Sequence, residues 1–143
     1  MTHWLYITDT DVWRGIVKHN VVGLPEVFRH RLEEVNIGDN IAVCGVEEGK
    51  KEEPEPVIYG VFKVVSEPFR DENIIFESTK AEIYPERIKV EPERVPAEPV
   101  FLQDTVGQLE MVTSKTNWEK DFLAHLIRKI SDSDFEKLKA ALG

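Results

Sequence analysis

The spacing of hydrophobic residues changes along this chain, and each change predicts a new element. A β-prone run over 4–8 predicts a strand, and the N-cap residues over 9–11 predict a helix directly after it. The apolar residues of that helix recur at helical spacing and are Val12, Trp13, Ile16 and Val17. The segment 22–25, Val-Gly-Leu-Pro, ends the helix, and a second helix is expected over 27–35. The chain is therefore expected to begin with a strand and two helices.

The middle of the chain has the patterns of strands. Strands are expected over 40–46 and 57–65, and Gly60 in the second stands where a bulge or a barrel bend is often found. Between them, residues 47–56 contain no apolar residue to bury, so we expect a flexible acidic loop. A further strand is expected over 83–90, where apolar and charged residues alternate.

The C-terminal part returns to helical spacing. From Asn117 a helix is predicted, because apolar residues spaced by four follow at Trp118, Phe122, Leu126 and Ile130. A capping box at 133–136, Ser-Asp-Phe-Glu, predicts the start of a last helix. Strands this numerous and this separated usually close into a small barrel with helices outside. We therefore predict an α+β fold, a small mixed or antiparallel β-barrel flanked by helices, as one domain over 1–143.

Composition supports a globular protein inside the cell. The chain has 143 residues, of which 41% are hydrophobic and 31% charged, and it has no apolar run near the roughly 20 residues of a membrane-spanning helix. The N-terminus lacks the features of a signal peptide, so we expect a cytoplasmic protein with no membrane partner. Cys44, the single cysteine, excludes an internal disulfide, and the four histidines lack zinc-site spacing, so we expect no metal and no cofactor.

The charge is strongly negative but uneven. Residues 13–31 carry four basic side chains against one acidic side chain, a charge of +3, which leaves −12 for the rest of a chain whose net charge is −9. A broad grip on a phosphate backbone needs many Lys and Arg residues, so this balance favours limited contact with a short piece of nucleic acid. The charged set is dominated by Glu and Lys and the chain has two Gln residues, a bias associated with thermophiles.

Several segments, taken in order, resemble the EVE family, a branch of the PUA-like superfamily whose relatives include the YTH readers of methylated adenine. The resemblance runs from about His3 to Phe135 and agrees with the order of elements given above. Its N-terminal segments are Trp4 with Ile7-Thr8, Trp13, 18–23 (Lys-His-Asn-Val-Val-Gly) and Gly38-Asp39. Its C-terminal segments are 60–62 (Gly-Val-Phe), 66–69 (Ser-Glu-Pro-Phe), Ile75-Phe76, Tyr84-Pro85, 87–90 (Arg-Ile-Lys-Val) and 115–118 (Lys-Thr-Asn-Trp).

The resemblance implies a pocket at one side of the barrel that holds a flipped-out base or a similar planar ligand. In the related readers an asparagine binds the base edge, and aromatic side chains form a cage. Asn20 takes the asparagine position, whereas Val22 and Cys44 stand where aromatic walls are common. Because stacking a base on an aromatic ring is worth about 1–3 kcal/mol, losing two walls weakens such a site by about a hundredfold or more. The ligand-binding residues implied in this way are Asn20, Val22, Gly23, Leu24, Cys44, Tyr84, Lys115 and Trp118.

In this interpretation Tyr84 and Trp118 sandwich the base, and Lys115 steadies a phosphate. Several of these residues also have a purely structural explanation. Asn20 is a residue type favoured in turns, and Gly23 is a type favoured where the backbone angle is unusual. Trp4 and Trp13 lie in periodic apolar patterns, so we expect both to pack in the core.

We therefore expect a non-catalytic domain that reads a modified nucleobase in RNA or DNA, presented as a short single strand or a flipped-out nucleotide. Two alternatives stay open: a small enzyme of the PUA-like superfamily that processes an amide or a nucleoside, and a protein-interaction module with a degenerate pocket. The sequence has no Gly-x-Ser-x-Gly elbow and no Gly-x-x-x-x-Gly-Lys-Ser/Thr loop, which favours binding over catalysis.

Overall fold

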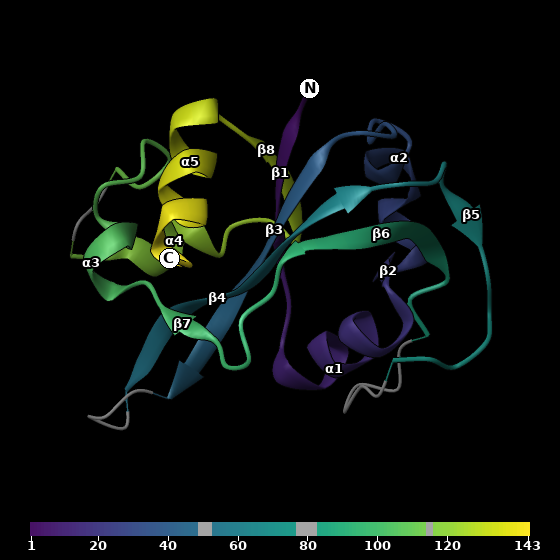
Figure 1. Cartoon of the computed structure of the whole chain (residues 1–143), viewed down its shortest axis with the longest axis horizontal. Coiled ribbons are helices and arrows are strands. Elements are labelled where there is room, and N and C mark those ends of the chain that lie inside the picture. Colours follow the sequence, from purple (N-terminus) through teal and green to yellow (C-terminus); the bar gives the residue numbers. More distant parts are fainter. Residues whose placement is uncertain (49–52, 77–82, 114–115) are drawn as a thin grey trace.

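A curled mixed sheet forms the centre of the protein in the computed structural model, which describes residues 1–48, 53–76, 83–113 and 116–143 (Figure 1). The strand order is β2-β6-β4-β3-β1-β8, and the short strands β5 and β7 pair with β6 and β4. Strands β1 and β3 are parallel, and the other pairs are antiparallel. The strands are β1 (His3–Ile7), β2 (Val21–Leu24), β3 (Asn40–Glu48), β4 (Pro54–Val64), β5 (Phe69–Arg70), β6 (Glu86–Arg94), β7 (Val100–Phe101) and β8 (Ile127–Ile130).

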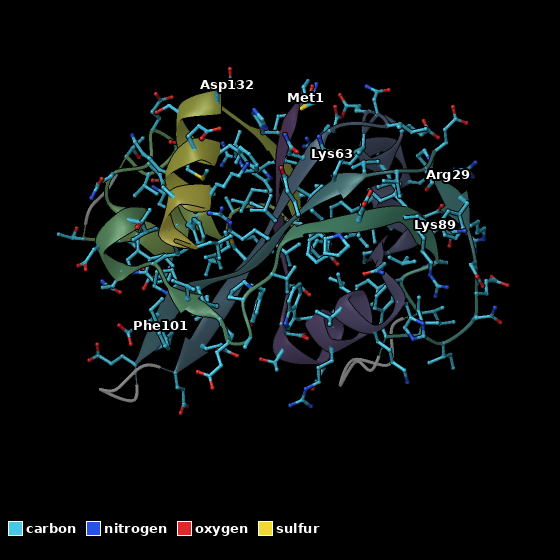
Figure 2. The ribbon with its side chains drawn as sticks, in the orientation of Figure 1. Met1, Arg29, Lys63, Lys89, Phe101 and Asp132 are labelled. Atoms are coloured by element: carbon cyan, nitrogen blue, oxygen red, sulfur yellow. The ribbon has the colours of Figure 1, made fainter. Side chains whose placement is uncertain are left out.

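Helices cover both faces of the sheet. Figure 1 shows the N-terminal helices on one side of the long strands β3 and β4 and the C-terminal helices on the other. In Figure 2, Arg29 and Lys89 lie on the first side, and Phe101 lies on the second. The helices are α1 (Thr10–His19), the 3-10 turn η1 (Glu26–Phe28), α2 (Arg29–Leu32), α3 (Gln103–Val106), α4 (Trp118–Phe122) and α5 (Asp132–Ala141). None of the described helices is long and apolar enough to cross a membrane.

The strands divide the buried side chains into two clusters, because successive residues of a strand point to opposite faces. We call the cluster beside α1 and α2 the α1 face; its largest members are Trp4, Tyr6, Tyr59, Phe62 and Phe76. We call the cluster beside α3, α4 and α5 the α5 face; its members include Leu5, Cys44, Ile58, Trp118, Phe122 and Phe135. Burying one large apolar side chain contributes about 1.5–3 kcal/mol, so both faces stabilise the sheet.

The α+β class and the architecture of a curled sheet flanked by helices confirm the fold predicted from the sequence. The first strand, the helix after it, and the strands that begin near 40 and 57 are also confirmed. The second helix is shorter than predicted and consists of the η1 turn followed by α2. The strand expected over 83–90 begins at Glu86 and continues to Arg94.

The prediction of one helix from Asn117 through Ile130 is wrong. Helix α4 ends at Phe122, and Ile127–Ile130 is the edge strand β8, which pairs with β1 from Tyr6 to His3. The physical reason is tertiary: β3 pairs with one edge of β1, and without β8 the backbone donors and acceptors of the other edge would lack partners, so strand pairing overrides a helical spacing of apolar residues.

Two boundaries also differ from the prediction. The last helix is capped by Ser131, whose side chain accepts a hydrogen bond of 3.1 Å from the Asp134 amide, and not by a capping box that starts at 133. The acidic segment 47–56 is not a loop at its ends, since β3 extends to Glu48 and β4 begins at Pro54. Residues 49–52 lie outside the described part of the chain.

Candidate functional site

The point where β1 ends and α1 begins gathers polar groups on the α1 face. Asp9 caps the helix, and its Oδ1 accepts a hydrogen bond of 2.9 Å from the Val12 amide. The Thr10 hydroxyl donates to Glu47 Oε1 over 2.9 Å, which ties the start of α1 to β3. Two carboxylates therefore lie close to the end of β1.

Tyr59 on β4 stands in a β-bulge that faces these groups. Val43 pairs with Gly60, but Cys44 pairs with Ile58, so Tyr59 is the extra residue of β4. A bulge re-aims the side chain that it carries, and bulges are common next to functional sites. The register shift lies where the sequence predicted a bulge or bend, beside Gly60.

The hydroxyl group of Tyr59 is buried without a hydrogen-bond partner among the described residues. The neighbouring Thr10 hydroxyl donates its proton to Glu47 instead. Burial raises the pKa of Tyr59 to about 12; the adjacent Thr10 side chain opposes this shift and the negative charges of Glu47 and Asp9 add to it, so the phenol is neutral at physiological pH. A buried polar group without a partner is uncommon in native proteins and calls for an explanation, such as a bound water or ligand.

An aromatic ring lies against Tyr59. Trp13 of α1 stacks on it with ring centroids 5.0 Å apart and an interplanar angle of 22°, and it meets Phe62 edge-on at 5.7 Å. Trp13 is half-buried, in contrast to the fully buried Trp4. The prediction that both tryptophans pack in the core is confirmed for Trp4, whereas Trp13 packs against the core and is only partly buried.

The carbonyl group of Gly23 is already engaged. It accepts a hydrogen bond of 2.7 Å from the hydroxyl of Tyr6, a buried residue of β1. Burial raises the pKa of Tyr6, and the nearby Tyr84 hydroxyl raises it further. The Tyr6 phenol is therefore a neutral donor that fixes β2 against β1.

Gly23 has no room for a side chain. A Cβ atom there would lie 2.6 Å from the Phe76 ring and 3.0 Å from the Tyr84 Cβ. The Phe76 ring also packs on Gly15 of α1, where a Cβ would be 2.7 Å away. Two glycines therefore create the flat space in which this aromatic ring is seated, and the space beside Gly23 is filled by Phe76 in this structure.

Tyr84 and Phe76 are fixed in turn by Arg87. The Arg87 side chain is 1% exposed, its Nε donates to the Tyr84 carbonyl over 3.0 Å, and its guanidinium lies over the Phe76 ring at 5.5 Å. It also donates to the carbonyls of Asn73 and Ile83 and pairs with Asp71 at 3.5 Å. Burial lowers the pKa of Arg87, and Asp71 opposes that shift.

The backbone of Tyr84 adopts a left-handed conformation, with φ of 53°. Such a conformation in a non-glycine residue costs about 1–2 kcal/mol. The hydrogen bond from Arg87 to its carbonyl helps to hold it there.

Open space lies beside Tyr84, in a pocket whose lining does not include Gly23. A pocket of about 370 Å³ is lined by Pro25, Glu26, Arg70, Glu72, Ile83, Tyr84 and Pro85. Arg70 pairs there with Glu86 at 2.9 Å, Glu72 at 3.1 Å and Glu26 at 3.3 Å. Because three carboxylates surround one guanidinium, this pocket is poorly suited to a phosphate.

The structure brings some of the residues implied by the family resemblance together. Gly23 and Tyr84 are in contact, and Val22 and Leu24 lie beside them as fully buried members of the α1 face. Asn20 is the left-handed C-cap of α1, with φ of 54°, and its side chain is exposed. The structural explanation of Asn20 therefore accounts for its conformation.

Other implied residues are separated from this group. Cys44 and Trp118 belong to the α5 face, on the opposite side of the sheet from Val22 and Tyr84. Tyr84 and Trp118 therefore do not come together to sandwich one ligand, because the sheet lies between them. Lys115 lies outside the described residues.

The part of the candidate site around Tyr6, Tyr59 and Trp13 was not predicted from the sequence. Tyr6 and Tyr59 were treated only as residues of strands, and Trp13 only as core. The signal that points to Tyr59 is Gly60, because a glycine in a β-rich run predicts a bulge and a bulge changes where its neighbours point. No sequence signal shows that Trp13 is less buried than Trp4, since each lies in a periodic apolar pattern, Trp13 in a helix and Trp4 in a strand.

The chain belongs to the EVE domain family, whose profile matches residues 2–141. The matched range includes both faces of the sheet and every described residue of the candidate site. The match confirms the resemblance drawn from the sequence.

Among individual proteins, the chain is 32% identical to a UPF0310 protein of Pyrococcus abyssi over 144 residues, which cover 99% of this chain and 100% of that protein. Its fold is similar to that of the human THYN1 protein in complex with DNA containing 5-methylcytosine, with a TM-score of 0.59, 14% identity and coverage of 99% and 98% of the two chains. It is also similar to the Mmi1 YTH domain in complex with RNA, with a TM-score of 0.62, 9% identity and coverage of 99% and 77%.

Proposed function

We propose that this protein is a non-catalytic nucleic-acid-binding domain that reads a modified nucleobase, with the base held on the α1 face beside Trp13 and Tyr59. Support comes from membership of the EVE domain family and from the kinds of ligand found with two proteins of similar fold, DNA containing 5-methylcytosine and RNA. Both are nucleic acids, which makes a base the first ligand class to test.

The observation that carries the proposal is the Tyr59 hydroxyl group, which is buried and, among the described residues, unpartnered beside the partly buried Trp13. A nucleobase has the two features that this pair of residues can recognise. Its edge carries hydrogen-bond donors and acceptors, and its face stacks on an aromatic ring with about 1–3 kcal/mol. Tyr59 supplies the polar contact, and Trp13 supplies the stacking surface.

The state of the ionisable groups supports binding over chemistry. Tyr59 is neutral at physiological pH, and burial raises the pKa of the Cys44 thiol, so that thiol is protonated and a poor nucleophile. Cys44 also faces α5, away from Tyr59. Neither group supplies the activated nucleophile that covalent catalysis needs.

The proposal is tested with a panel of nucleosides and short oligonucleotides that carry modified or unmodified bases, screened by thermal shift. We expect at least one modified base to stabilise the protein more than its unmodified parent. Tyr59→Phe removes the hydroxyl while keeping the ring. Because an unpartnered buried hydroxyl costs about 1–3 kcal/mol, the variant should melt at the same or a higher temperature but lose the ligand-induced shift.

Tyr6→Phe is the matched control, since it removes a hydroxyl that already donates to Gly23. It should lose stability by about 1 kcal/mol and keep the preference for the modified base. A panel without any response at millimolar ligand would remove the proposal. So would a Tyr59→Phe variant that responds to the ligands as the unaltered protein does.

A further inference from the structure

A small basic pocket lies at the β8 edge of the sheet, apart from the base site. It has a volume of about 280 Å³ and is lined by Trp4, Arg31, Glu34, His125, Arg128 and Lys129. Arg31 comes from α2, and Arg128 and Lys129 come from β8, so segments distant in the sequence meet there. Three cationic side chains face one carboxylate, in a protein whose net charge is −9.

The guanidinium groups of the two arginines of this pocket make few hydrogen bonds or ion pairs with the described residues. Among the described residues, the Arg31 side chain has no hydrogen-bond or ion-pair partner, and the Arg128 guanidinium makes one long hydrogen bond of 3.5 Å, to the Asp121 carbonyl. Guanidinium groups present several donors in a planar fork that matches a phosphate in a bidentate geometry. Their donors are therefore available to an anion.

Lys129 is held more firmly than the arginines. Its ammonium group lies 5.6 Å from the ring centroid of the buried Trp4 and pairs with Glu34 at 3.7 Å. Trp4 thus forms an apolar floor, and Lys129 supplies a positioned charge above it. Glu34 is the single acidic side chain of the lining, and it competes with any anion for Lys129.

We propose that this pocket binds a backbone phosphate of a single-stranded nucleic acid. The inference rests on the proposed function for the identity of the anion. Because the remainder of the chain is acidic, a local cluster of this size fits contact with one or two phosphates and not with a long duplex. Of the four basic residues in the stretch 13–31, Arg31 lines this pocket.

The pocket and the candidate base site lie on the same side of the sheet. Trp4 is on β1 and Tyr59 is on β4, with β3 between them, so the two strands are about 10 Å apart. A short single strand can therefore place a base beside Tyr59 and a phosphate in the basic pocket.

The test measures the salt dependence of binding for a short oligonucleotide and for an abasic oligonucleotide of the same length, which has a backbone but no bases. We expect Arg31→Gln with Arg128→Gln to lower the slope of log K against log salt by about 0.7 for each phosphate that the variant no longer neutralises. The matched control is Lys137→Gln, on α5, where the ammonium group donates to the Gln108 carbonyl over 2.8 Å. It removes one positive charge outside the pocket and should leave the slope unchanged.

A variant that should strengthen phosphate binding distinguishes a loss of charge from damage to the fold. Glu34→Gln removes the acidic side chain from the lining, so we expect it to raise the affinity for the abasic oligonucleotide several-fold at low salt. The melting temperatures of all variants are measured alongside as a check on folding.

The outcomes separate this inference from the proposed function. Binding of the abasic oligonucleotide that depends on Arg31 and Arg128, without any preference for a modified base, would support the phosphate pocket and contradict base reading. Base preference that depends on Tyr59, with a salt slope unaffected by the arginine variants, would support base reading and overturn the phosphate pocket. A protein that binds neither oligonucleotide nor nucleoside overturns both.

Discussion

The two faces of the sheet use their buried residues differently. The α5 face is apolar, and Asp134, the one buried charged residue among those described there, is satisfied by the amides of Glu110 and Met111 at 2.6 and 3.1 Å. The α1 face buries the guanidinium of Arg87 and the hydroxyls of Tyr6 and Tyr59, and the last of these lacks a partner among the described residues. An unsatisfied group on an otherwise well-packed face calls for an explanation, such as a bound water or ligand. Both faces contribute stability, and the proposed function places recognition on the α1 face.

The largest expected effect is on the α5 face. Phe122 is fully buried there, and Phe122→Ala leaves a cavity that should reduce the free energy of unfolding by about 3–5 kcal/mol. Denaturant unfolding measures this loss. The folded fraction should keep the same preference among nucleosides, and a change in that preference would break the assignment of recognition to the α1 face.

A smaller loss is expected from Gly23→Ala on the α1 face. The added methyl would meet the Phe76 ring at 2.6 Å and force it to move, which should cost about 1–3 kcal/mol and reduce ligand binding at the same time. Gly107→Ala is the control, because nothing lies within 4 Å of its Cβ position. An unaltered melting temperature for Gly23→Ala would show that the close packing of Phe76 does not constrain this face.

The smallest effect on stability is expected at Asn20, whose side chain either binds the base or only caps the helix. Its left-handed backbone disfavours alanine, so Asn20→Ala should cost about 1 kcal/mol, whereas Asn20→Gly removes the same side chain and tolerates the conformation. Thermal melting of both variants, with and without ligand, distinguishes the roles. If the side chain binds the base, Asn20→Gly stays stable but loses the ligand response; if it is only a helix cap, the response is kept.

The sequence predicted the architecture better than the site. Hydrophobic spacing located the first strand, α1, β3 and β4, because each buries residues with the period of its own element. The same spacing wrongly predicted a helix at Ile127–Ile130, because apolar residues spaced by four carry no information about the strand that pairs with the edge of β1. A local pattern of apolar residues does not predict strand pairing between residues more than a hundred positions apart.

The candidate site was predicted only in part, for a related reason. The family resemblance placed Gly23 and Tyr84 near each other, and the structure agrees. It also grouped Cys44 and Trp118 with them, although the sheet separates the two sets. Which face a strand residue occupies depends on its register in the sheet, which the spacing of residues in one sequence does not specify.

Ligand recognition by the α1 face can be followed through the indole N–H signals of the tryptophans, in a nuclear magnetic resonance titration with the modified nucleoside that gives the largest thermal shift. Trp13 belongs to the α1 face and Trp118 to the α5 face, so each ring reports on one side of the sheet. If the α1 face binds the ligand, the Trp13 signal shifts with ligand concentration and the Trp118 signal does not. A shift of Trp118 with a static Trp13 would contradict recognition by the α1 face.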